Sequence, residues 1–135
     1  MFSKDSTLNA ESLSVIEQFC EHMPGGFFIY KACGEEELLY ANRAVCDIFG
    51  CDNLEAFKAL TGFTFRGMVH PEDYERVSTA ICNQVQDSRN ALDHIVYRIV
   101  RQDGEIRWID DYGHYVESDI GEGFIMDDYV MERRF

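Results

Sequence analysis

The sequence predicts an α+β domain in which short helices cover one face of an antiparallel sheet. Apolar residues alternate as in strands near both ends of the chain, and the residues between them follow a helical spacing. A third observation is Asp103-Gly104, which separates two half-apolar runs as in a β-hairpin. Strands at both ends with helices in the middle are typical of α+β proteins.

Length and composition fit one domain with its own hydrophobic core. The chain has 135 residues, of which 46% are hydrophobic and 13% aromatic, so it needs no disulfide or metal to fold. Its net charge of −13 argues against partners such as nucleic acid or an anionic membrane. No apolar run is long enough to span a membrane and no signal-peptide pattern is present, which predicts a cytoplasmic protein.

The five cysteines are interpreted as free thiols. Their number is odd, no CxxC spacing occurs, and most lie within apolar patterns. A zinc site needs closely spaced pairs of ligands, and the sequence has none.

The first element is an amphipathic helix from about Asn9 to Met23, followed by Pro24-Gly25-Gly26. Because this helix is set apart from the other elements, its apolar face must pack on the domain's own sheet or on another subunit. The candidate dimer-interface residues on this face are Val15, Ile16, Phe19 and Met23.

Two short strands and two short helices follow. The strands are expected at Phe27–Lys31 and Leu38–Tyr40. Asn42 is suited to cap a short helix that Gly50 ends. Asp52 and Glu55 have the spacing of a capping box for a second helix, which closes at Thr61-Gly62.

The longest helix is predicted to begin at Pro71 and to reach about Gln86. Glu72 and Asp73 would lie at the positive end of its dipole. His70, just before the proline, is assigned to turn formation rather than to ligand binding.

The hairpin of residues 96 to 113 is given a register by assuming a two-residue Asp103-Gly104 loop. Ile99 then pairs with Trp108, which places Tyr97 and Trp108 on one face of the sheet. The other face would hold Arg98 and Asp111, close enough for an ion pair. Both faces also carry apolar residues, so we expect both to be at least partly covered. A last short strand completes the sheet.

Several motifs in this order resemble the PAS domain family. They are the segments YANRAVCDIFG, MVHPEDYERV and YRIVRQDGEIRWI, and the match runs from about Gly25 to Met126. The segment MPGGFFIYKA is similar to PAS modules that precede bacterial cyclic-dinucleotide cyclase domains. The family's Asp-Ile-Thr-like ending is missing, although Asp127 or Asp128 can take the place of its aspartate.

The resemblance implies a PAS-like five-stranded antiparallel sheet, with short helices on one face and an amphipathic N-terminal helix. It also implies a bacterial, cytoplasmic sensory and dimerisation module that is not an enzyme and that acts on an effector domain, such as a cyclic-dinucleotide cyclase or a histidine kinase. We divide the chain into an N-terminal helix (1–24), a sensor domain (25–127) and the start of a C-terminal linker (128–135).

The identity of a ligand or cofactor stays open. The cysteine motif that forms flavin adducts is absent, and no histidine is a clear haem ligand, so the cofactor is unknown, either a small organic molecule or none. We also find no nucleophile paired with a base and therefore expect no catalysis. The candidate pocket-lining residues are Phe28, Tyr30, Phe49, Phe57, Phe65, Met68, Tyr97 and Trp108. The alternative is that these residues fill the core of a purely structural interaction domain without a ligand.

Overall fold

Five antiparallel strands form one sheet, as the sequence predicted. The structure is a computed structural model that describes residues 10–21, 23–87, 92–118 and 123–133. The strands are β1 (Gly26–Lys31), β2 (Leu38–Ala41), β3 (Leu92–Val100), β4 (Ile106–Ser118) and β5 (Gly123–Glu132). The helices are α1 (Ala10–Cys20), α2 (Arg43–Ile48), α3 (Leu54–Thr61), α4 (Phe65–Met68) and α5 (Tyr74–Asp87). The strand order β2-β1-β5-β4-β3 places the last strand in the middle of the sheet.

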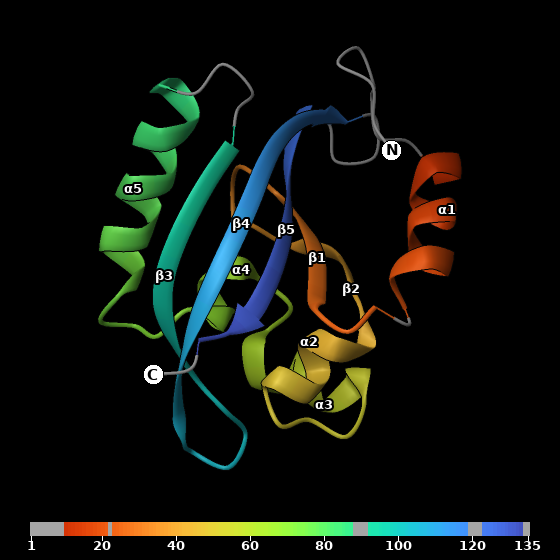
Figure 1. The fold of residues 1–135 in the computed structure, drawn as a ribbon, viewed down its shortest axis with the longest axis vertical. Helices are drawn as coiled ribbons and strands as arrows, with labels where there is room; N and C mark the ends of the chain where they lie inside the picture. Colours follow the sequence, from red (N-terminus) through yellow and green to blue (C-terminus); the bar gives the residue numbers. More distant parts are fainter. Residues whose placement is uncertain (1–9, 22, 88–91, 119–122, 134–135) are drawn as a thin grey trace.

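Helices α2 to α5 cover one face of the sheet, which we call the inner face. Their buried side chains share one core with those of the strands, and Phe28, Phe57 and Tyr97 are among its members. Figure 1 shows α5 beside β3 at one edge of the sheet and α1 beyond β2 at the other edge. None of the described helices is both long and apolar enough to cross a membrane.

The end of α1 packs on the opposite, outer face of the sheet. Cys20 is buried there in a small cluster with Ile29, Tyr40 and Ile125. By contrast, Phe19 of the same helix is 72% exposed. Among the described side chains of α1, that of Cys20 at its end is the one that packs on the domain's own sheet.

Asn42 connects this end of α1 to the core. As predicted, its side-chain oxygen caps α2 by accepting from the Val45 N–H at 3.2 Å. Its amide nitrogen donates to the carbonyls of Cys20 at 2.7 Å and Gly25 at 3.1 Å. The side chain is fully buried, so these bonds fix α1, the start of β1 and α2 relative to one another.

The β3–β4 loop differs from the prediction. Its turn holds three residues, because the Arg101 N–H donates to the Glu105 carbonyl at 2.8 Å and the Gly104 N–H to the Arg101 carbonyl at 2.9 Å. Gly104 has a φ of +87°, which fits a turn followed by a left-handed residue. The assumed two-residue loop is therefore wrong.

The longer turn shifts the register of the hairpin by one residue. Arg98 lies opposite Trp108, and Tyr97 lies opposite Ile109. Since a shift of one residue moves a strand's side chains to the other face, Trp108 lies on the outer face and Asp111 on the inner face. The ion pair expected between Arg98 and Asp111 does not form, because the two side chains are on opposite faces.

Three element boundaries also differ from the predictions. Asn53, and not Asp52, caps α3 by accepting from the Ala56 N–H at 2.8 Å. Helix α5 begins at Tyr74, since residues 71–73 form a turn before it. The last strand is long: β5 reaches Glu132, so residues 128–132 belong to the sheet and not to a linker.

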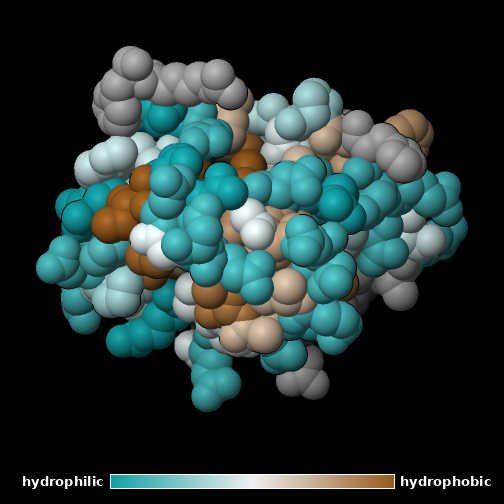
Figure 2. Space-filling model, turned by 90° about the horizontal axis from the view of Figure 1, so that it is seen from below, coloured by the Kyte–Doolittle hydropathy of each residue, from teal (hydrophilic) through white to brown (hydrophobic). Residues whose placement is uncertain are grey.

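Figure 2 views the molecule from the end that carries the β3–β4 loop, α2 and α3. The apolar groups on this surface are separated by hydrophilic side chains. Leu54, Leu60 and Ile106, which lie on α3 and at the start of β4, are among the exposed apolar residues of the molecule.

Candidate functional site, an acidic cavity beside helix α5

The predicted pocket-lining residues do not form one pocket. Seven of them are buried in the inner core, namely Phe28, Tyr30, Phe49, Phe57, Phe65, Met68 and Tyr97. Trp108 is 38% exposed on the outer face, because the register of the hairpin is shifted. Of the eight, only Tyr30 lines the cavity described next. The other six buried residues fill the core, which was the alternative interpretation of their aromatic and apolar character.

A cavity of about 270 Å³ lies between α5 and the inner face. Helix α5 contributes one wall, and strands β1, β4 and β5 contribute the opposite wall through Tyr30, Tyr115 and Met126. Glu36, from the β1–β2 loop, is the one charged side chain among the described residues that line it. The lining residues are Tyr30, Ala32, Glu36, Ser78, Ile81, Cys82, Val85, Gln86, Tyr115 and Met126.

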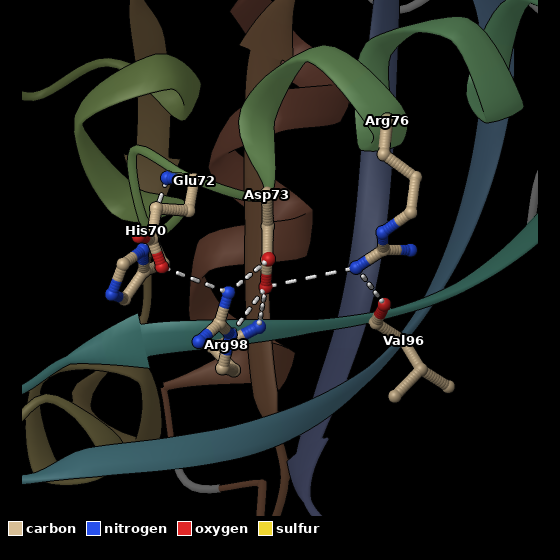
Figure 3. Close-up of polar contacts among 6 residues, drawn as sticks. All are labelled: His70, Glu72, Asp73, Arg76, Val96 and Arg98. Carbon is tan, nitrogen blue, oxygen red and sulfur yellow. Dashed lines mark hydrogen bonds and ion pairs between the residues drawn. The ribbon is translucent and has the colours of Figure 1, made fainter.

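Asp73, immediately before α5, fixes the start of this helix to strand β3 (Figure 3). Its carboxylate accepts hydrogen bonds from the Arg98 backbone N–H at 2.9 Å and from Arg98 Nη2 at 2.6 Å. These hydrogen bonds outweigh burial and lower the pKa of Asp73 to about 2. His70 accepts from the Glu72 N–H through Nδ1 at 3.0 Å, which confirms its assignment to the turn.

Further bonds from α5 occupy the free edge of β3. Arg76 Nη2 donates to the Val96 carbonyl at 3.1 Å (Figure 3). Gln84 pairs with both backbone groups of His94, at 2.8 and 3.1 Å. An edge strand otherwise leaves such groups unpaired. Helix α5 is thus held at its start and near its end, with the cavity beside its middle and last turns.

Three buried aspartates lie on the inner face next to the cavity. Asp93 on β3 and Asp128 on β5 are both in register with Gly113 on β4, so the three form one row. Asp111 is two residues from Gly113 on the same face. The exposed fractions of Asp93, Asp111 and Asp128 are 5%, 1% and 0%.

Gly113 leaves the space that this row needs. A Cβ atom at this position would lie 2.7 Å from Asp93 Oδ2, closer than real contacts allow. The Asp93 carboxyl therefore lies over β4, toward Asp128. Strand β4 carries no side chain at this point of the inner face, so that the acidic row is continuous across three strands.

Asp111 and Asp128 interact electrostatically in the interior. Neither oxygen of Asp128 has a hydrogen-bond partner among the described residues. Burial raises the pKa of both carboxyls, and the charge of Asp111 raises the pKa of Asp128 further, well above its ordinary value. These shifts favour the neutral, protonated form of a buried carboxyl. The Tyr97 hydroxyl donates to Asp111 Oδ2 at 2.7 Å.

Two further carboxyls near the cavity have raised pKa values. Burial and the charge of Asp111 raise the pKa of Asp93 to about 7. Burial also raises the pKa of Glu36, against the lowering effect of a 2.5 Å hydrogen bond from the Tyr74 hydroxyl. Glu36 has a φ of +59°, a conformation that costs energy for a residue other than glycine.

The acidic row does not form a metal site in this arrangement. Among the residues that the structure describes, no group of three or more acidic, histidine or cysteine side chains has a geometry suited to a metal ion. His94 and His114 lie on the outer face, beside Asp110 at 2.9 Å and Asp127 at 3.7 Å. His22 lies outside the described residues. All five cysteines are free, and Cys33 and Cys82 are exposed.

The sequence reasoning placed Asp110 and Asp111 on opposite faces but missed the acidic row. The wrong register assigned Asp111 to the face with Arg98, and β5 was expected to end before Asp128. The alternation of inner and outer residues along each strand could have indicated that these acids point inward. Asp93 and Asp128 each stand at an inner position between or beside apolar inner residues, Ile95 in one strand and Met126 and Val130 in the other.

The sequence matches the family model described as PAS fold over residues 38–126. The chain belongs to the PAS fold family. Members of this family are generally sensory, non-catalytic modules of signalling proteins. A comparison with curated protein sequences finds no match.

Solved structures of PAS domains are similar to this chain. The PAS domain of an HTR-like protein from Haloarcula marismortui has a TM-score of 0.65 at 16% identity, over 91% of this chain and 93% of that one. A PAS domain protein from Colwellia psychrerythraea has a TM-score of 0.70 at 12% identity, over 90% and 96% of the chains. The LOV protein from Rhodobacter sphaeroides has a TM-score of 0.69 at 14% identity, over 90% and 66%. At these identities the similarity shows the shared fold.

Proposed function

We propose that this PAS domain is a cytoplasmic sensory module that binds a small molecule in the cavity between α5 and the sheet. The observation that carries the proposal is the cavity itself, with buried polar groups beside it that lack partners among the described residues. Binding sites are mostly apolar hollows with a few polar groups that orient the ligand, and this cavity fits that description.

Strand β5 offers a route from the cavity to an effector domain. Met126 and Asp128 on this strand lie at or beside the cavity, and the strand continues to Glu132. A ligand that moves these residues changes the pairing of β5 with β1 and β4. The effector belongs to the classes of cyclic-dinucleotide cyclases or histidine kinases. A two-component sensor histidine kinase contains a PAS domain with a TM-score of 0.68 to this chain.

We further propose that α1 contributes to a homodimer. Val15 and Phe19 are 44% and 72% exposed, whereas Met23 packs against the small cluster on the outer face. The side chain of Ile16 lies outside the described residues. Exposed apolar side chains on one helix support association with a second copy, since this contact would remove them from water.

Ligand retention tests the sensory proposal. We expect native mass spectrometry of the purified protein to show a bound small molecule that denaturation releases. Cys82 lines the cavity, so Cys82→Phe should fill it and abolish retention. Cys33→Phe, a change at an exposed cysteine outside the lining, is the matched control. A wild-type protein without ligand, whose stability no small molecule changes, would instead favour a purely structural interaction domain.

Sedimentation tests the dimer. Phe19→Glu together with Ile16→Glu should give a folded monomer, with Glu17→Lys on an exposed position of α1 as the control. A wild-type protein that is monomeric at high concentration contradicts this part of the proposal and leaves the ligand site unaffected.

A further inference from the structure

The cavity beside α5 has a buried end and an exposed end. Tyr30 and Met126, each 2% exposed, lie at the buried end on neighbouring strands of the sheet. Cys82 and Gln86 of α5, which are exposed, lie at the other end. A ligand that enters from solvent therefore passes α5 and reaches Tyr30 last.

The hydroxyl group of Tyr30 makes no hydrogen bond with the described residues. Its ring stacks on Phe65 with 4.5 Å between centroids, but its pKa is affected by burial and by charges and not by a hydrogen bond. By contrast, the hydroxyls of Tyr40, Tyr74 and Tyr97 each donate to a carboxylate. Tyr30 is thus a buried tyrosine whose polar group is left to the cavity that it lines.

This hydroxyl group is a hydrogen-bond donor at neutral pH. Burial, followed by the charges of nearby carboxyls, raises the pKa of Tyr30 well above its ordinary value. The group therefore keeps its proton and can donate it to an acceptor. A buried polar group without a partner costs free energy, and a ligand that accepts this bond removes the cost.

The lining does not suit a charged ligand. Glu36, its one charged side chain among the described residues, already accepts from the Tyr74 hydroxyl at 2.5 Å and interacts with the charge of Arg66. A cationic ligand would compete with these contacts. An anionic ligand would meet the acid and no basic side chain of the described lining. Since an unpaired charge is costly to bury, both kinds of ligand are disfavoured.

The rest of the lining suits an apolar molecule. Ile81 and Val85 of α5 lie on one wall, and Ala32 and Met126 lie on the strand side. Such side chains favour a ligand that brings apolar surface out of water. The volume of about 270 Å³ limits this ligand to a small molecule.

We propose that the cavity binds a small uncharged molecule with an apolar body and a carbonyl-type acceptor, and that the Tyr30 hydroxyl donates a hydrogen bond to this acceptor. This inference rests on the proposed sensory function and assigns its ligand class. The acceptor lies at the buried end of the cavity. The apolar body extends along Ile81 and Val85 toward the exposed end.

Four probes of similar size test the ligand class, with thermal shift and calorimetry as the measurements. Acetophenone has the acceptor, ethylbenzene lacks it, benzoate is an anion and benzylamine is a cation. We expect acetophenone to raise Tm most and ethylbenzene to raise it less, because both fit the apolar walls and only the ketone accepts from Tyr30. Benzoate and benzylamine should leave Tm unchanged.

Tyr30→Phe removes the donor and keeps the ring. This variant should weaken acetophenone binding about fivefold, the effect of one hydrogen bond, and leave ethylbenzene binding unchanged. Tyr112→Phe, on the outer face and 47% exposed, is the matched control and should change neither. Infrared spectra of isotope-labelled acetophenone should show a lower carbonyl frequency when bound to the wild type than when bound to Tyr30→Phe. Ethylbenzene binding and circular dichroism verify that the variant cavity is intact.

The outcomes separate this inference from the sensory proposal. Equal binding of acetophenone and ethylbenzene, both lost in Cys82→Phe, overturns the acceptor and keeps the sensory cavity. Strongest binding of benzoate or benzylamine overturns the uncharged ligand. An equal loss of both neutral probes in Tyr30→Phe overturns the role of its hydroxyl group. Binding of no probe also overturns the inference, and a charged molecule retained in native mass spectrometry would show that the cavity still binds a ligand.

Discussion

The aspartates on the two faces of the sheet differ in their neighbours. Asp110 and Asp127 point to the outer face, where each lies beside a histidine of a neighbouring strand. Asp111 and Asp128 follow them directly in the chain and point to the inner face, where they meet no basic group among the described residues.

This contrast distinguishes the acids of the outer face from those of the candidate site on the inner face. The side chains of Asp110 and Asp127 are only 16% and 10% exposed, but each has a histidine beside it. Buried acids without a basic partner cost stability, and such groups are concentrated at functional sites. The inner face therefore holds buried acids at a cost in stability, whereas the acids of the outer face have basic neighbours.

The largest expected effect is on the pH dependence of stability. Asp93 has a folded pKa of about 7 against an ordinary value of 3.8, so the folded state binds more protons between these values. Asp111 and Asp128, which face it, are shifted in the same direction. The free energy of unfolding should fall by about 3 kcal/mol from pH 5 to pH 8.

Urea unfolding at pH 5, 6, 7 and 8 measures this profile. Asp93→Asn should make the profile shallower, because one of the shifted groups is then gone. Asp52→Asn, at an exposed position, should leave the slope unchanged. A wild-type stability that increases over this pH range contradicts the protonated state of the acidic row.

Replacing Asp128 should stabilise the protein at high pH. An asparagine at this position donates its amide N–H to Asp111 without taking a proton from solvent, so Asp128→Asn should raise the free energy of unfolding by about 2 kcal/mol at pH 8. The gain should shrink toward pH 4, where the unfolded aspartate is also protonated. Asp52→Asn, at an exposed position, is the control. Destabilisation of Asp128→Asn at pH 8 would show that Asp128 is ionised and partnered.

The contrast between the faces also explains what the sequence can and cannot predict. Alternation and capping patterns are local, so the five-stranded sheet, the Asn42 cap and the Thr61-Gly62 helix end were predicted correctly. The side of the sheet to which Trp108 and Asp111 point depends on the register, and the register depended on one turn residue. The row of Asp93, Gly113 and Asp128 comes from three strands, and no spacing within one strand indicates it.

Asp73 provides the opposite case, a buried acid with partners. Its side chain is 7% exposed and accepts three hydrogen bonds from Arg98. Because its folded pKa of about 2 lies below the ordinary 3.8, its contribution is complete above pH 3.8 and is lost as the pH falls through 2. At pH 7, Asp73→Asn should lower the free energy of unfolding by about 2 kcal/mol.

Equilibrium unfolding of Asp73→Asn checks this effect. Asp47→Asn removes an exposed ion pair with Arg43 and should change stability little. If the two variants behave alike, Asp73 does not hold the start of α5 to β3.

The smallest effect tests whether the acidic row acts as a unit. Tyr97→Phe removes the donor to Asp111 Oδ2 and should lower the free energy of unfolding by about 1 kcal/mol. Tyr112→Phe, on the outer face and 47% exposed, is the control. In the Asp128→Asn background the cost of Tyr97→Phe should be smaller, because the introduced amide supplies Asp111 with another donor. Equal costs in both backgrounds would mean that Tyr97 and Asp128 act on Asp111 independently, and the double-mutant cycle measures this difference directly.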